Sequence, residues 1–426
     1  MRPRLDDRPA HRRLLAVAAL GVMALPAVTG CWGRGGDDPG AEPPPGGPAT
    51  AGPSSPAGPS APASPSTPGR PSTPAPPRPS TPAPRPTDAG TWRLLPASPV
   101  SGGPYLTHVW TGTELIIHNI VRDASGTSRV VDAAYNPFTS RWRKLPANPY
   151  PVRNTEGGYR AVWTGTEMLT FGQSNAAYNP RTNRWRPIAP GPAGPSVTVW
   201  TGRQVLMWGG GCCGDESAQG WAYEPRSNAW RKLPPAPLSG RHTTGVWTGW
   251  EMVVVGGTRH GVELTDGAAY NPATRSWRKI ASLPTPRLQA TLTWTGAEVL
   301  MVGGGTWNQW TWRPYQDGLG YNPYTNRWRR LPTMEQVRSQ HMAVWTGRRL
   351  LVWGGVPVPF SSRPGLAGGA AYSPATNRWS VLPSAPLGGR SSAAAAWTGR
   401  EMLIWGGTTG STPRSDGAAY RPPPAS

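Results

Sequence analysis

After its first 30 positions, the sequence has no segment in which helix-forming residues follow a 3.6-residue period. This absence excludes long amphipathic helices from the folded part of the chain. Short apolar runs separated by Gly, Pro and Asn occur instead, and the chain contains 54 Gly and 54 Pro. Such runs are typical of an all-β protein with many turns. The sequence also lacks a Gly-x-Ser-x-Gly nucleophile motif and a glycine-rich phosphate loop, so neither motif assigns it to an enzyme class.

Lysine is almost absent, although the formal net charge is +21. The only lysines are Lys144, Lys232 and Lys279, so arginine provides nearly all of the positive charge. Such an excess can indicate binding to nucleic acid, to an anionic membrane or to an acidic polymer. It can also reflect charges spread over a solvated rim. We favour the solvated rim and expect no nucleic-acid partner.

Long apolar runs are confined to the N-terminus. Arg12 and Arg13 precede an apolar run over residues 14–28, which is short for a membrane span and typical of a secretory signal. The run ends in Val28-Thr29-Gly30-Cys31, which resembles the lipobox of bacterial lipoproteins. The resemblance implies that residues 1–31 are a signal peptide and that Cys31 receives a lipid anchor. The alternative is an ordinary secretory signal.

Residues 32–88 consist mainly of Pro, Ser, Thr, Ala and Gly. This composition cannot bury a core and favours extended polyproline II structure. At ~3.1 Å per residue, the segment would reach well over ~100 Å when fully extended. We predict a disordered tether between the lipid anchor and a folded domain that covers residues 89–426.

The folded domain is a repeat. Trp-Thr-Gly occurs seven times, beginning at Trp110, Trp163, Trp200, Trp247, Trp294, Trp345 and Trp397. Each copy is followed by a tyrosine, namely Tyr135, Tyr178, Tyr223, Tyr270, Tyr321, Tyr372 and Tyr420. Six of these tyrosines precede a further tryptophan by seven residues, at Trp142, Trp185, Trp230, Trp277, Trp328 and Trp379. Repeats of this length indicate a solenoid, a propeller or an array.

Each repeat contains four strand-like segments, and four strands repeated seven times predict an all-β, seven-bladed β-propeller. An apolar strand that ends in Gly-Gly, followed by a Tyr and then a Trp, resembles the kelch-repeat family, which includes the galactose-oxidase-like central domain. The first repeat has His118-Asn119-Ile120 where the fourth has Val255-Gly256-Gly257. We expect the backbone of the first blade to differ at that corner.

The ring is expected to close through its two ends. The last repeat lacks its final tryptophan, whereas an isolated Trp92-Arg93-Leu94-Leu95-Pro96 precedes the first repeat and matches the fourth strand of the others. We predict that this N-terminal strand completes the seventh blade and leaves no open sheet edge.

The strand order defines two faces. The turns that join strands one and two, and strands three and four, share one face, which we call the turn face. The loops that join strands two and three, and successive blades, share the opposite face, which we call the loop face. Because the loop-face segments vary among the repeats, we expect binding there.

One loop-face segment is rich in aromatic residues. Its candidate ligand-binding residues are Trp307, Trp310, Trp312 and Tyr315. Aromatic rings in a loop suit stacking on a sugar or contact with an apolar partner. The alternative is a small core that packs the loop against the propeller.

Four arginines, Arg241, Arg287, Arg338 and Arg390, precede a Trp-Thr-Gly by six or seven residues. In kelch propellers an arginine at this position is common near the central channel, so the four are further candidates for binding a carboxylate or phosphate. The alternative is a structural role in satisfying loop carbonyl groups. Cys212 and Cys213 lie in another loop and are candidates for a vicinal disulfide outside the cytoplasm. We expect no metal site, because no histidine lies within the usual ligand spacing of this pair.

The resemblance also raises the question of catalysis. A copper site of the galactose-oxidase type needs a Tyr, His and Cys–Tyr constellation, and the histidines of this sequence are scattered over several repeats. We therefore expect no cofactor and favour a binding module over an enzyme. The predicted protein is an extracytoplasmic, lipid-anchored monomer that binds a protein or an envelope glycan. The alternative is a carbohydrate-active enzyme of the galactose-oxidase or sialic-acid-epimerase type.

Overall fold

The computed structural model describes residues 89–424 except residues 104, 123–127, 151–159, 173–174, 193, 212–215, 310 and 360. The predicted signal peptide and tether, with Cys31, therefore lie outside the described residues, as do Cys212, Cys213 and Trp310. In the described part of the chain, no helix is long and apolar enough to cross a membrane.

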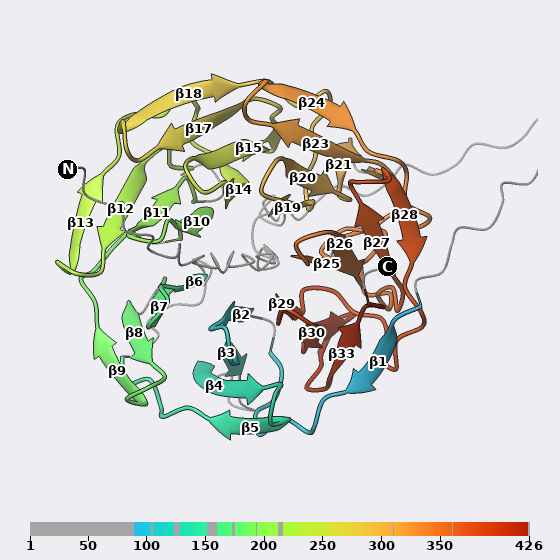
Figure 1. Cartoon of the computed structure of the whole chain (residues 1–426). Helices are drawn as coiled ribbons and strands as arrows, with labels where there is room; N and C mark the ends of the chain where they lie inside the picture. The colour runs from blue at the N-terminus through green and yellow to red at the C-terminus, as the bar shows by residue number, and fades with distance from the viewer. Residues whose placement is uncertain are drawn as a thin grey trace, which may run out of the picture. The chain divides into compact units, whose positions relative to one another are not determined.

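The described residues form seven blades of four antiparallel strands, arranged in a ring (Figure 1). Blade 1 consists of β2 (Tyr105–Trp110), β3 (Leu115–Arg122), β4 (Ser128–Asn136) and β5 (Arg141–Lys144). Blade 2 consists of β6 (Arg160–Trp163), β7 (Met168–Phe171), β8 (Ala176–Asn179) and β9 (Arg184–Pro187). Blade 3 consists of β10 (Val197–Trp200), β11 (Val205–Trp208), β12 (Gly220–Glu224) and β13 (Ala229–Lys232).

The remaining blades follow the same order. Blade 4 consists of β14 (His242–Trp247), β15 (Met252–Arg259), β17 (Gly267–Asn271) and β18 (Ser276–Ile280). Blade 5 consists of β19 (Thr291–Trp294), β20 (Val299–Val302), β23 (Gly318–Asn322) and β24 (Arg327–Arg330). Blade 6 consists of β25 (Met342–Trp345), β26 (Leu350–Trp353), β27 (Gly369–Ser373) and β28 (Arg378–Val381). Blade 7 consists of β29 (Ala394–Trp397), β30 (Met402–Trp405), β33 (Gly417–Arg421) and β1 (Thr91–Leu94).

Short hairpins extend the loops between second and third strands. In blade 4, β16 (Val262–Glu263) pairs with the end of β15. In blade 5, β21 (Gly305–Asn308) pairs with β22 (Thr311–Pro314). In blade 7, β31 (Thr408–Thr409) pairs with β32 (Thr412–Pro413). These hairpins all belong to the loop face.

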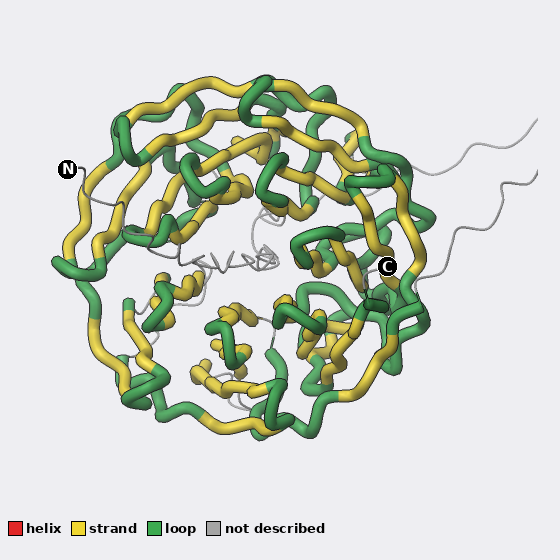
Figure 2. The backbone as a smooth tube through the Cα atoms, viewed as in Figure 1, coloured by secondary structure: helices red, strands yellow, loops and turns green. Residues whose placement is uncertain are grey.

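Hydrophobicity decides the place of each strand in its blade. The first strands lie nearest the centre of the ring and the fourth strands form its rim (Figures 1 and 2). The second strands are mostly apolar and buried, and β20 and β30 are so throughout, because neighbouring blades cover both of their faces. The fourth strands instead have exposed ends and half-buried centres, as in β9 and β13. This gradient from centre to rim confirms the predicted fold.

The hydrophobic core is divided among the boundaries between blades. Each of the seven apolar clusters contains residues from two neighbouring blades. The cluster between blades 4 and 5, for example, joins Val253 and Val255 of β15 to Val299 and Met301 of β20. Each blade is therefore stabilised by both of its neighbours, and the ring needs every blade to bury its apolar surface.

The ring closes as predicted. Strand β1 pairs antiparallel with β33, so that Trp92 lies opposite Tyr420. The indole Nε1 of Trp92 donates a hydrogen bond to the carbonyl oxygen of Pro383, in the segment after blade 6, at 2.9 Å. The same bond to the preceding blade is made by Trp142, Trp185, Trp230, Trp277, Trp328 and Trp379. The closing strand thus reproduces the contact that joins every other pair of blades.

The first blade differs, as predicted, at the corner where blades 3 to 7 have two glycines. In blade 4 both glycines have positive φ, and a Cβ atom on Gly257 would lie 2.2 Å from the carbonyl oxygen of His242. In blade 1, residues 118–120 lie within β3 without a positive φ and pair with β2 in an unbroken register, whereas the register between β14 and β15 shifts at the glycine corner of blade 4. His118 Nδ1 lies 2.7 Å from Asp132 Oδ1 in the neighbouring strand, and both side chains are buried. A polar pair therefore replaces a glycine corner in this blade.

Candidate functional site

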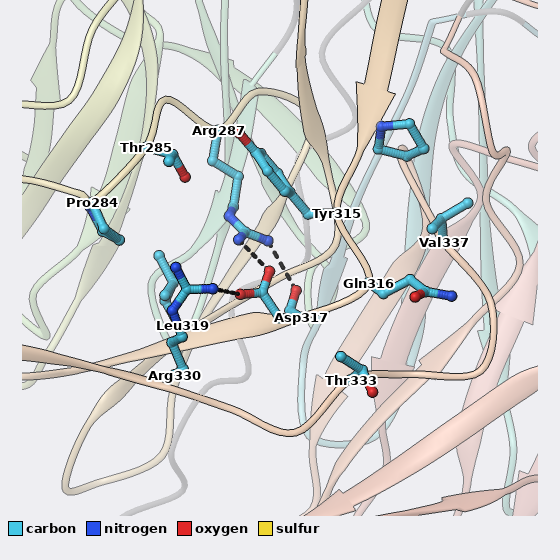
Figure 3. A pocket seen from close by; sticks show the side chains of 11 residues that line it. Pro284, Thr285, Arg287, Tyr315, Gln316, Asp317, Leu319, Arg330, Thr333 and Val337 are labelled. Carbon is cyan, nitrogen blue, oxygen red and sulfur yellow. Dashed lines mark hydrogen bonds and ion pairs between the residues drawn. The ribbon is translucent and has the colours of Figure 1, made fainter. Parts of the chain in front are cut away.

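A pocket of about 380 Å³ opens on the loop face of blade 5 (Figure 3). Three segments line it: residues 284–287 before the blade, residues 314–319 between β22 and β23, and residues 330–337 after the blade. All three belong to the connections that define the loop face. The structure therefore locates a cavity on the face where the sequence predicts binding.

Asp317 connects two arginines within this pocket, as the dashed lines in Figure 3 show. Arg287 Nη2 donates to Asp317 Oδ1 at 2.6 Å, and Arg330 Nη1 donates to Asp317 Oδ2 at 3.1 Å. The guanidinium of Arg287 also lies 4.3 Å from the centre of the Tyr315 ring. Because two cations share one carboxylate, the pocket retains a net positive charge.

The two arginines differ in exposure. The side chain of Arg287 is 1% exposed, whereas that of Arg330 is 74% exposed. Arg287 therefore holds Tyr315 and Asp317 in place, and Arg330 presents its remaining N–H groups to solvent. Thr285, Gln316 and Thr333 add neutral polar side chains to the lining. The pocket is equipped to accept hydrogen bonds from its ligand's donors and to donate to carboxylate, hydroxyl or carbonyl oxygens.

The hairpin β21–β22 leads directly into the pocket. The ring of Trp312 is buried. The Trp307 ring packs edge-to-face with it, with 5.2 Å between the ring centres, and Trp307 is 39% exposed. Glu263 of β16 accepts hydrogen bonds from the Thr306 hydroxyl and from the Trp307 backbone N–H. Of the predicted aromatic residues, Trp312 thus belongs to a small core, whereas Trp307 and Tyr315 lie at the surface of the hairpin and the pocket.

The four recurrent arginines do not form an open cationic ring. Their side chains are buried, and their guanidinium groups donate to protein oxygens. Arg241 and Arg390 contact Asp266 and Asp416, respectively, which lowers the pKa values of these two carboxyl groups. Burial lowers the pKa of Arg338 to about 10, and this side chain donates to carbonyl oxygens at 2.8 and 2.9 Å. This arrangement corresponds to the alternative in which the four arginines satisfy loop carbonyl groups. Of the four, Arg287 alone lines the pocket.

Two histidines near the centre of the ring link neighbouring blades: His108 lies in β2, and His341 directly precedes β25. His108 Nε2 lies 2.8 Å from the Ala395 carbonyl oxygen of β29, and His341 Nε2 lies 3.1 Å from Thr291 Oγ1. Burial lowers the pKa values of His108 and His242 to about 4 and that of His341 to about 3. These side chains are therefore neutral at physiological pH. Among the described residues, no group of three or more His, Cys, Asp or Glu side chains is placed to hold a metal ion.

The turn face is dominated by ion pairs between the first turn and the fourth strand of a blade. In five blades an arginine donates through both Nε and Nη2 to the two oxygens of a glutamate, with Nη2 distances of 2.6 or 2.7 Å. We call this arrangement the arginine–glutamate fork. The five forks are Arg93–Glu401, Arg143–Glu114, Arg186–Glu167, Arg278–Glu251 and Arg329–Glu298. Much of the arginine charge at the rim is therefore neutralised by acidic partners.

The sequence analysis did not identify an aromatic cluster on the turn face. The Trp250 ring lies 5.3 Å from the Trp294 ring and 5.1 Å from the ring of Tyr324, which is 73% exposed. Trp250 belongs to blade 4, whereas the other two belong to blade 5. One sequence signal could have indicated this cluster. Only the fourth repeat has a tryptophan directly after Trp-Thr-Gly, whereas the other copies have Thr, Arg or Ala there.

Comparison with known proteins agrees with this geometry. Residues 173–355 match the family model described as the KLHDC2/KLHL20/DRC7 Kelch-repeats domain. The matched residues extend from blade 2 into blade 6, and the match supports Kelch-type repeats in this part of the propeller. No curated protein sequence matches the chain. Among solved structures, a fungal alcohol oxidase of the AA5 family in complex with copper has a TM-score of 0.60 and 12% sequence identity. The match covers 79% of this chain and 77% of that chain, and it shows a shared fold.

The similarity to a copper enzyme does not extend to a described metal site. Copper in proteins is bound by sets of side chains such as His and Cys, and the described residues of this Kelch propeller do not bring three such groups together. The structure is a rigid ring of blades with variable loops on one face, and loops on a rigid scaffold are where binding residues are commonly found.

Proposed function

We propose that this Kelch propeller is a binding module that recognises a protein or an envelope glycan through the loop face of blade 5. The observation that supports the proposal is the pocket around Tyr315 and Arg330 at the base of a hairpin that exposes Trp307. An exposed indole provides a flat apolar contact, and the pocket beside it provides charged and neutral donors. Ligand sites typically combine such apolar area with a few directed polar groups.

The binding test compares two positions on one strand. Arg330 lies at the loop-face end of β24, and Arg327 is an exposed arginine at the turn-face end of the same strand. The full chain would be titrated with soluble envelope glycans while tryptophan fluorescence is recorded. Binding should weaken about tenfold or more in Trp307→Ala and in Arg330→Ala, because each loses a direct contact, and Arg327→Ala should bind as the wild type does.

A protein partner would be found by a second arm of the same test. A photoreactive residue at position 316, inside the pocket, should cross-link one partner at the cell surface, and Arg330→Ala should reduce the yield. The control places the photoreactive residue at position 324, on the turn face. Equal yields at both positions, together with no glycan response at the loop face, would contradict the proposal.

We further propose that residues 1–31 direct export, that Cys31 is lipidated, and that residues 32–88 tether the propeller to the outer side of the cell membrane. The proposal rests on the lipobox-like Val28-Thr29-Gly30-Cys31 and on the proline-rich composition that follows it. Globomycin should block maturation, and Cys31→Ser should release the protein from the membrane fraction. Unchanged processing and unchanged fractionation would show that Cys31 is not an anchor.

A further inference from the structure

The boundary between blades 3 and 4 departs from the pattern of the turn face. At the boundary between blades 4 and 5, Arg278 forms its fork with Glu251 and donates a further hydrogen bond to the hydroxyl of Tyr321 at 3.3 Å. That hydroxyl in turn donates to Asn326 Oδ1 at 2.9 Å. The guanidinium therefore has a carboxylate partner, and the buried hydroxyl has both a donor and an acceptor.

The equivalent positions between blades 3 and 4 have different side chains. Gln204 replaces the glutamate, and Arg231 donates one hydrogen bond, from Nη2 to Gln204 Oε1 at 3.1 Å. Arg275 occupies the position of the asparagine. Tyr270 is fully buried, and its hydroxyl has no hydrogen-bond partner among the described residues. Compared with the boundary between blades 4 and 5, this boundary lacks the glutamate carboxylate and the asparagine oxygen, and it has a second arginine.

These replacements have an energetic consequence. A buried hydroxyl without a partner destabilises the fold relative to a satisfied one. A guanidinium that contacts a neutral amide forms a weaker hydrogen bond than one that contacts a carboxylate. The nearby exposed Arg203 is already paired with Glu224 at 3.1 Å, so this carboxylate is engaged elsewhere. The boundary is therefore short of negative charge in the bare protein.

We propose that the turn face at the boundary of blades 3 and 4 binds a carboxylate supplied by an acidic segment of a partner protein. The carboxylate contacts the Arg231 guanidinium and takes the role that Glu251 has at the next boundary. Five other blades of this molecule use a glutamate for that purpose, which identifies the chemical class of the ligand. Arg275, at the position of the asparagine, adds a second cation and favours a segment with several acidic residues over a single one. The site lies on the face opposite the pocket and is independent of the function proposed above.

The test uses an acetylated and amidated hexaglutamate peptide as the probe and the full chain as the protein. Binding is measured by calorimetry at fixed ionic strength. The wild type should bind, and Arg231→Gln should weaken binding about tenfold, as expected for the loss of one charge-assisted contact. Gln204→Glu should weaken binding by a similar factor, because it gives Arg231 a carboxylate within the chain. The exposed Arg348→Gln, on the turn face of blade 6, is the matched control and should bind normally.

The source of the carboxylate is decided by a second probe. Free glutarate should bind far more weakly than hexaglutamate if the site is built for an acidic segment, and equal affinities would instead assign it to a small free carboxylate. Gln204→Glu should also raise the melting temperature without any ligand, since it completes the fork. If hexaglutamate fails to bind, or binds equally to wild type, Arg231→Gln and Gln204→Glu, the proposal is wrong and any attraction is nonspecific.

Discussion

The two faces of the propeller are made by the same chain but follow different rules. On the turn face, short turns repeat almost unchanged, and most fourth strands are joined to their first turns by arginine–glutamate forks. On the loop face, the connections vary in length and hairpin content. The difference indicates that the turn face stabilises the ring. Because its contacts repeat from blade to blade, a blade that departs from the pattern can be recognised by comparison with the others. The loop face has no such reference, so its function must be inferred from shape and exposure.

The largest effect is expected from breaking the closure on which both faces depend. Deletion of residues 89–97 removes β1 and the contacts of Trp92 with Tyr420 and Pro383. Blade 7 would then expose an unpaired sheet edge and part of its apolar cluster. We expect loss of a cooperative melting transition, measured by calorimetry or near-ultraviolet circular dichroism. A deletion variant that melts like the wild type would contradict the closure.

Acid should weaken the centre of the ring, which lies between the two faces. The pKa values of His108, His242 and His341 fall to about 4, 4 and 3, below the usual 6.5. The unfolded chain therefore binds protons between pH 6.5 and about 4 while the folded chain does not, so stability is complete above pH 6.5 and decreases as the pH falls. At pH 5.5 the loss should be about 1.4 kcal/mol for each histidine.

This pH dependence can be measured by urea unfolding at a series of pH values. His108→Gln should reduce the slope of stability against pH, because one titrating group is removed. The exposed and non-titrating Phe138, which is 59% accessible, provides the control, since Phe138→Ala should leave the slope unchanged. A slope that is the same in His108→Gln and the wild type would show that His108 does not contribute.

The two faces should also differ in the cost of losing an arginine. Arg390 of the loop face is completely buried and contacts the Asp416 carboxylate and three backbone carbonyls, so Arg390→Ala should cost about 3 kcal/mol in the free energy of unfolding. Arg143 of the turn face is 35% exposed, so Arg143→Ala should cost about 1 kcal/mol. Urea unfolding of both variants checks the comparison. Equal costs would show that burial does not separate the two kinds of pair.

The smallest effect is expected for the aromatic cluster of the turn face. Trp250→Thr installs the residue found at this position in the first two repeats, and it should cost about 1 kcal/mol, the size of an aromatic pair contact. A double-mutant cycle with Tyr324→Ala would isolate the contact between these rings. A cost above about 3 kcal/mol would be typical of core burial and would place Trp250 in the core rather than at the surface.

Prediction from the sequence succeeded where the repeat supplied several copies of one signal. The strand order, the mostly apolar second strands and the closing role of Trp92 all followed from comparing the seven copies. The site was less predictable. Tyr315 and Arg287 were both candidates, but their contact at 4.3 Å joins residues from different connections and depends on how blade 5 packs. Trp312 and Trp307 have similar sequence surroundings, yet one is buried and the other is exposed.

The sequence by itself determined the number of blades, their four-strand pattern and the closure of the ring, because hydrophobic periodicity and turn residues are local properties that were repeated seven times. Only the tertiary structure decided which arginines are buried scaffold and which reach solvent, since that depends on acceptors contributed by other strands. Arg390 and Arg330 illustrate the difference, with side chains 0% and 74% exposed. A guanidinium has the same charge in both places, and its role is set by whether the surrounding oxygens have already replaced water.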